Sequence, residues 1–304
     1  MAILNGIISK MKGSAGNLTF KQRNGQTIVC EKPTEMKNPR TQAQMKGRTK
    51  WANIVAMYRG IRPLLNYGFE SKPLGVTDYN MFMKVNMQQT PVYLTKQKVA
   101  GGACIAAPYQ ITQGSLPSIV ISGSGNSSAT DIFLGGENLA ASTTVSAFSK
   151  AVVDNNPDYR YGDQISYFII RQKVNEATNI PYCQFEGHAV VLDAADTSKL
   201  WDIVPKNGFY AQDGCIGKYG NDGDCVFAWV HSRKSNGKTL VSSQSLIDAN
   251  SKLADYQGDM AYSLAASSYG ETGSAFLTPN ANSDSGINSG GSGGGSSMGG
   301  GDSL

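Results

Sequence analysis

Residues 225–243 read C-V-F-A-W-V-H-S-R-K-S-N-G-K-T-L-V-S-S, which is the pattern of a β-hairpin. The first strand-like run is Asp224–Ser232, in which two sets of mostly apolar residues alternate along the chain. A second run extends from Thr239 to Ser243. Between them lies Asn236-Gly237, a dipeptide that tolerates the positive φ angles of a two-residue hairpin turn. The stretch therefore predicts two antiparallel strands.

Further strand candidates follow one another from about residue 100, separated mostly by glycine, asparagine or serine turns. A charged fraction of only 16% and 35 glycines favour such a turn-rich β protein over a helical one. The candidates are Tyr109–Thr112, Ser118–Ser122, Asp131–Leu134, Thr143–Phe148, Gln164–Val174 and His188–Leu192. Their spacing predicts an antiparallel β-sandwich over residues 101–270. Residues 245–256 form either a short helix or an excursion of the last edge strand.

The first hundred residues predict a hairpin followed by two helices. Asn17–Glu31 carries another Asn-Gly turn between alternating residues. Thr41 can cap a helix that Pro63 either ends or kinks. A second helix is expected from Asp78 to Met87, with Thr77 as its cap. We therefore divide the chain into a basic hairpin-and-helix module at 1–100, the sandwich at 101–270, and a glycine- and serine-rich flexible tail at 271–304.

One apolar stripe is expected on the first helix. Its members recur at helical spacing and should face inward: Met45, Trp51, Ile54, Val55, Tyr58 and Ile61 or Arg62. Lys46, Arg48, Lys50 and Arg59 lie largely off this stripe. The stripe thus predicts a buried tryptophan and an exposed basic face.

Charge is divided unevenly along the chain. Residues 1–100 hold 16 lysines and arginines against 4 acidic residues, whereas residues 101–304 hold 11 against 19. The first part therefore has a net charge of +12 and the remainder −8, within a total of +4. A basic part of this kind is attracted to an acidic partner, which could be nucleic acid, a protein surface or the acidic part of another copy.

The basic charge is densest between Lys37 and Trp51, where five of fifteen residues are basic and none is acidic. Three interpretations remain open: a solvated helix face, a docking surface for a protein, or a surface that neutralises phosphates. The residues that would make such a contact are Lys37, Arg40, Lys46, Arg48, Lys50 and Arg59.

Catalytic and metal-binding patterns are scarce. Two histidines, His188 and His231, and five scattered cysteines show no zinc-ligand spacing. Gly237-Lys238-Thr239 lacks the first glycine of a phosphate loop, and residues 154–158 and 221–224 fit turns better than a calcium loop. We expect a protein that is not an enzyme, with no cofactor, metal or small-molecule substrate.

We expect no secretion signal, and no apolar run in the sequence reaches membrane-spanning length. We expect no membrane partner, and a location in the cytoplasm or in a virus particle.

The segment Asn38-Pro39-Arg40-Thr41, followed by Gln44, Arg48 and Trp51, resembles an uncharacterised family found in Bacteroidota genomes and their bacteriophages. Members combine an early hairpin, this N-P-R-T segment, a helix with glutamine, arginine and an aromatic residue, and a β-rich remainder. Residues 226–244 are similar to the family's late hairpin. At residues 12–17 the usual glycine–lysine order is shifted, and Phe20 replaces a common tryptophan.

The resemblance covers most of residues 10–245 but implies no activity or catalytic residues. Its phage association favours a structural or interaction protein, such as a head- or tail-associated virion subunit that docks through its basic module on a protein or on copies of itself. The alternative is a cytoplasmic protein whose basic helix binds nucleic acid.

Overall fold

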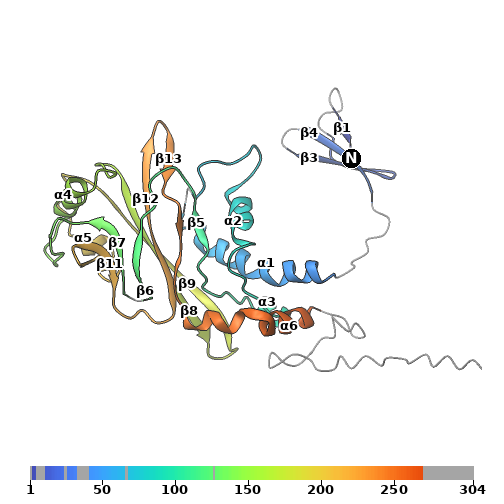
Figure 1. Cartoon of the computed structure of the whole chain (residues 1–304). Helices are drawn as coiled ribbons and strands as arrows, with labels where there is room; N and C mark the ends of the chain where they lie inside the picture. The colour runs from blue at the N-terminus through green and yellow to red at the C-terminus, as the bar shows by residue number, and fades with distance from the viewer. Residues whose placement is uncertain are drawn as a thin grey trace, which may run out of the picture.

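The structure is a computed structural model that describes residues 2–4, 11–23, 26–32, 41–65, 68–125 and 127–269. Antiparallel strands dominate it, which confirms the mainly-β fold predicted from the sequence (Figure 1). An N-terminal sheet has the strand order β1-β4-β3-β2. Its strands are β1 Ala2–Leu4, β2 Gly13–Ala15, β3 Leu18–Arg23 and β4 Gln26–Glu31. The predicted hairpin is β3–β4, and its turn at residues 24–25 lies outside the described residues.

The central sheet has the order β13-β12-β8-β9, with β15 pairing part of β12. Its strands are β8 Gln164–Asn175, β9 Ile180–Val191, β12 Cys225–Ser235, β13 Lys238–Val241 and β15 Ile247–Ala249. β12 and β13 form the hairpin predicted from residues 225–243, and Asn236 and Gly237 have φ angles of 50° and 74° at its turn. β8 and β12 end one and three residues beyond their predicted ends, and β9 begins eight residues before its predicted start.

Two further sheets complete the β structure. The larger has the order β10-β11-β7-β6, and the smaller pairs β14 with β5. Their strands are β5 Gln110–Thr112, β6 Ile121–Ser124, β7 Ser127–Phe133, β10 Tyr210–Gln212, β11 Cys215–Tyr219 and β14 Gln244–Ser245. The helices are α1 Gln42–Ile61, α2 Asp78–Asn86, α3 Lys96–Ala100, α4 Val145–Asn155, α5 Leu200–Ile203, α6 Gly258–Ser268 and a 3₁₀ helix, Ser251–Tyr256.

Strands β8 and β12 are buried on both faces over most of their length, and their successive side chains point to opposite sides of the sheet. On β8, Tyr167 and Ile169 pack with α4 and with the sheet that contains β7 and β11. Phe168 and Ile170 point the other way and pack with α1 and α2. Figure 1 shows these two sets of elements on opposite sides of β8 and β12. The core on the α1 side thus joins residues from before and after residue 100.

The segment Thr143–Phe148 corrects the sequence prediction, because it begins a helix rather than a strand. Thr144 caps α4, its side chain accepting a hydrogen bond from the Ala147 N–H at 3.2 Å. Val145 and Phe148 then lie one turn apart, buried against the central sheet. The β-branched residues that suggested a strand are therefore a helix cap and the first turn.

The predicted ends of the first two helices are confirmed. Thr41 caps α1 and Thr77 caps α2, each side chain accepting an N–H from the third residue that follows. α1 ends at Ile61, two residues before Pro63. Within the described part of the chain, none of the helices is long and apolar enough to span a membrane.

Candidate functional site

Helix α1 carries most of the basic residues predicted to contact a partner. Its inner face is formed by Met45, Ile54, Met57 and Ile61, each no more than 4% exposed. This face holds α1 against the core, and it fixes which basic side chains are available at the surface.

Asn53 is a polar member of the inner face and has no exposed surface. Its amide donates to the Ile105 carbonyl at 2.9 Å and to the Tyr109 hydroxyl at 3.1 Å, and its oxygen accepts the Ile105 N–H at 2.7 Å. Thr49 is equally buried and donates to the Met45 carbonyl at 2.9 Å. The buried side of α1 is therefore partly polar.

The outer face of α1 consists of Arg48, Trp51, Arg59 and Arg62, around the half-buried Val55. Spacings of three and four residues place all of them on one side of the helix. Trp51 is 45% exposed, so the prediction that it lies on the buried stripe is wrong. The true inner face is rotated away from Trp51, because Asn53 and Met57 face the core.

The basic residues predicted as a partner site separate into three groups. Arg48 and Arg59 share the outer face, whereas Lys46 and Lys50 project from another side of α1. Lys50 is only partly exposed, and its ammonium donates to the Met87 carbonyl at 2.7 Å. Burial, and then the charge of Lys46, lower the pKa of Lys50. Lys37 and Arg40 lie outside the described residues.

The outer face keeps a positive charge. Among the residues that the structure describes, no ion pair involves Arg59 or Arg62. A nearby carboxylate, Asp78, is paired with Lys72 at 2.8 Å. An exposed indole among guanidinium groups is suited to an acidic surface that also offers an apolar or aromatic contact.

Sequence reasoning missed Trp51 and Arg62 as members of this face. Residues 48, 51, 55, 59 and 62 recur at intervals of three and four, as the residues of a helix face do, and this spacing was the available signal. A prediction based on apolar residues places Trp51 on the buried face, but the polar Thr49 and Asn53 are buried and Trp51 is exposed.

The two histidines were the candidates for catalysis. His231 is 1% exposed and its Nε2 lies 2.9 Å from Oδ2 of Asp163. Arg233 donates to both oxygens of the same carboxylate at 2.7 Å, and the Tyr159 ring stacks on the imidazole at 4.3 Å. Ser242 accepts the backbone N–H of His231 rather than contacting its ring.

These contacts determine the charge states of the cluster. Burial lowers the pKa of His231, although Asp163 opposes that effect. Burial would raise the pKa of Asp163, but hydrogen bonds from Arg233 and His231 lower it overall. A neutral, enclosed imidazole beside a carboxylate held by arginine is suited to supporting the fold.

The acidic turn at residues 221–224, weighed as a calcium site, is occupied by protein contacts. Asp222 pairs with the buried Lys218 at 2.9 Å and with Arg171 at 3.2 Å. Asp224 accepts hydrogen bonds from Ser251. Over the described ranges, no group of three or more histidine, cysteine or acidic side chains is arranged to hold a metal ion.

A second surface combines acidic and aromatic side chains. Asp131 and Phe133 lie on the outer side of β7, and Asp213 lies in the turn before β11. All three are exposed, Phe133 by 44%. Asp131 and Asp213 lie near enough to Cys215 that, after burial, their charges raise the pKa of its thiol. We call Asp131, Phe133 and Asp213 the acidic face.

Comparison with protein-family models, curated proteins and solved structures finds no match to this chain.

Proposed function

We propose that the protein is a non-enzymatic assembly subunit, and that the outer face of α1 docks on the acidic face of another copy. The observation that carries the proposal is Trp51, exposed between Arg48 and Arg59 on one side of a rigid helix. Tryptophan and arginine are the residues that contribute most often to strong protein–protein contacts.

Charge complementarity supports a second copy as the partner. The basic first hundred residues and the acidic remainder attract each other between molecules. The acidic face offers two carboxylates and an exposed phenyl ring, which match the guanidinium groups and the indole. Because the two faces differ, the contact is head-to-tail, and repeating it forms a ring or a filament.

We propose a bacteriophage particle, in a head- or tail-associated position, as the setting of this assembly. That part rests on the resemblance of the N-P-R-T segment and its helix to a phage-associated family. Detection of the protein by mass spectrometry in purified particles, at a fixed copy number, is the expected result. Particles that lack the protein would contradict the virion role.

The docking contact can be tested by exchanging charges between its two faces. Variant R48E/R59E/R62E should sediment as a monomer at concentrations where the wild-type protein associates, and so should variant D131R/D213R. Mixing the two variants should restore association, because each retains the face that complements the other. Variant K150E/K206E changes lysines elsewhere and should associate like the wild type.

Two results would contradict the proposal: a wild-type protein that stays monomeric at all concentrations, or a mixture that fails to associate. Binding of duplex DNA, measured by fluorescence anisotropy, distinguishes the nucleic-acid alternative from docking on another copy. Affinity for DNA that falls steeply with salt and is lost in R48E/R59E/R62E, without any change in sedimentation, would favour that alternative.

A further inference from the structure

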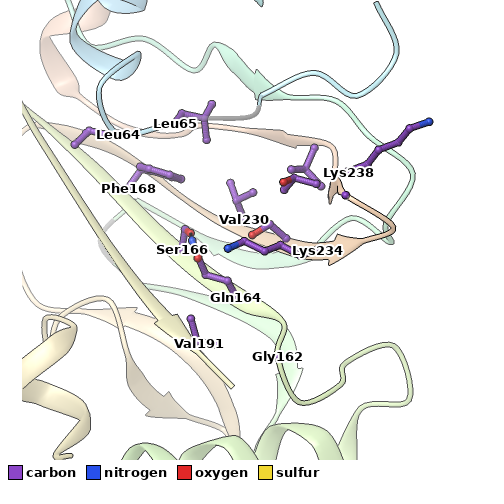
Figure 2. Close-up of a pocket in the computed structure, with 14 residues that line it drawn as sticks. Leu64, Leu65, Gly162, Gln164, Ser166, Phe168, Val191, Val230, Lys234 and Lys238 are labelled. Atoms are coloured by element: carbon purple, nitrogen blue, oxygen red, sulfur yellow. Dashed lines mark hydrogen bonds between the residues drawn. The ribbon is translucent and has the colours of Figure 1, made fainter. Parts of the chain in front are cut away.

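A groove of about 560 Å³ lies on the α1 side of the central sheet, where the helical cover ends (Figure 2). Phe168 lies opposite Ala228 in the strand register, and both are buried in the core beneath the helices. Farther along the same strands come the pairs Ser166–Val230 and Gln164–Ser232. The sheet face therefore changes from apolar to polar as it leaves the helices, and the groove crosses that boundary.

The two ends of the groove differ in chemistry. Leu64 and Leu65 form an apolar wall beside Phe168 and Val230. At the other end, Ser232 and Lys234 follow Val230 along β12, each two residues apart and therefore on the same face. Thr239 lies directly opposite Lys234 on β13. The polar side chains thus lie toward one end of the groove and the apolar ones toward the other.

The lining contains two lysines and no acidic residue. Figure 2 shows the ammonium of Lys234 pointing toward Ser166 and Gln164, while Lys238 points outward from the rim. Among the described residues no ion pair involves Lys234. The Gln164 amide donates to the Ser166 hydroxyl oxygen at 2.8 Å, which leaves the hydroxyl proton of Ser166 to be donated elsewhere.

We propose that this groove binds a small amphiphilic carboxylate, with its anionic group on Lys234 and its alkyl chain over Val230 and Phe168. The volume is within the roughly 300–1,000 Å³ typical of small-molecule pockets. Ser166, toward which the ammonium points, supplies a hydroxyl donor on that side of the groove, and a carboxylate forms strong charge-assisted hydrogen bonds with both groups. The ammonium points toward Ser166, which lies opposite Val230, so an alkyl chain that begins there would run over Val230 toward Phe168 and the wall formed by Leu64 and Leu65.

The first experiment is titration calorimetry of the full chain with saturated carboxylates. Decanoate should bind with one site per chain. Each methylene added from hexanoate to decanoate should tighten binding about threefold to fourfold, because it buries more apolar surface. Decanol should bind roughly tenfold more weakly than decanoate, since it cannot accept a charge-assisted hydrogen bond as an anion does.

Variants of the groove locate the site. Substitution K234Q should weaken decanoate binding roughly tenfold, whereas K234R keeps the charge and should retain most of the affinity. Val191 lines the groove and is 49% exposed, so V191E can place a carboxylate there at little cost to folding and should also weaken binding. K150Q, an exposed lysine on α4, should bind as the wild type does.

Three outcomes would overturn the proposal: no heat of binding with decanoate, equal affinity for decanol and decanoate, or unchanged affinity in both K234Q and V191E. Circular dichroism of each variant would identify a loss of binding caused by unfolding. If K234Q does not fold, V191E decides the proposal, because it leaves Lys234 in place and adds an opposing carboxylate to the lining; unchanged decanoate affinity in a folded V191E would overturn it.

Discussion

The imidazole of His231 and the carboxylate of Asp163 lie 2.9 Å apart, at positions no more than 2% exposed, and Arg233 balances the carboxylate charge from the other side. The folded protein therefore favours a neutral histidine, whose pKa burial lowers from its ordinary value near 6.5. This contact links the charge of one buried side chain to the stability of the sheet.

Stability should decrease as the pH falls below about 6.5, because the unfolded chain then binds a proton on His231 that the folded protein binds less readily. The free energy of unfolding, measured in urea at pH 7.5 and pH 5.0, should show this loss. H231Q retains a hydrogen-bond donor for Asp163 and should reduce the pH dependence. H188Q, the matched control, should keep it; equal slopes in all three proteins would contradict the assignment.

Removing the charge of Asp163 should destabilise the protein by about 3–5 kcal/mol, because D163N leaves the guanidinium of Arg233 without its carboxylate partner. The contribution of Asp163 is present at neutral pH, since its lowered pKa keeps it ionised until the pH falls below its ordinary value of 3.8. D158N changes an exposed neighbour and should cost less than about 0.5 kcal/mol. Urea unfolding at pH 7 measures both.

Truncation of two apolar residues of α1 should destabilise the protein by different amounts. M57A removes a side chain with no exposed surface and should cost about 2–5 kcal/mol. W51A, despite the larger side chain, should cost about 1 kcal/mol or less, because Trp51 is 45% exposed. Thermal or urea unfolding of the two variants tests the orientation of the helix. A larger loss for W51A than for M57A would show that Trp51 faces the core.

Asn53 connects α1 to the chain at Ile105. Although its side chain is polar, its removal should lower the free energy of unfolding considerably. N53A leaves the buried N–H and carbonyl of Ile105 without their side-chain partner, at about 1–3 kcal/mol for each unsatisfied group. Q44A, an exposed substitution on the same helix, provides the comparison. A cost for N53A as small as that of Q44A would contradict the described hydrogen bonds.

Two glycines, one near each end of α1, test how closely the helix packs against its neighbours. At Gly47 an added Cβ meets no atom within 4 Å, so G47A should stabilise the helix by about 0.5–1 kcal/mol. At Gly60 the same Cβ would lie 2.2 Å from the Phe185 ring, so G60A should instead destabilise by about 1–3 kcal/mol. G60A/F185A should recover the loss caused by the clash, relative to F185A alone. Stabilisation by G60A would mean that α1 and β9 are not in contact there.

Local signals made much of this fold predictable. The hairpin of β12 and β13 follows from Asn236-Gly237, whose turn geometry depends on adjacent residues only. The starts of α1 and α2 are predictable from Thr41 and Thr77, because a cap bonds to an N–H only three residues farther along the chain. Each of these predictions depends on hydrogen bonds within a few residues along the chain.

Predictions that depended on distant partners failed. The buried face of α1 was misassigned because Asn53 bonds to Ile105 and Tyr109, more than fifty residues away. The local pattern of Thr143–Phe148 favours a strand, whereas the segment begins a helix because Val145 and Phe148 pack into the core beside the central sheet. The groove at Lys234 was also not foreseeable, since β8, β12, β13 and the segment at Leu64 meet only in the folded chain.

The burial of β8 and β12 on both faces limits how these strands can vary in length. Because neighbouring side chains serve different cores, a single inserted residue would exchange Tyr167 with Phe168 and every pair beyond them. An insertion of two residues would preserve the alternation and displace only the register. Evolution of this chain should therefore tolerate gains and losses in its loops, and admit them in these strands mainly in even steps.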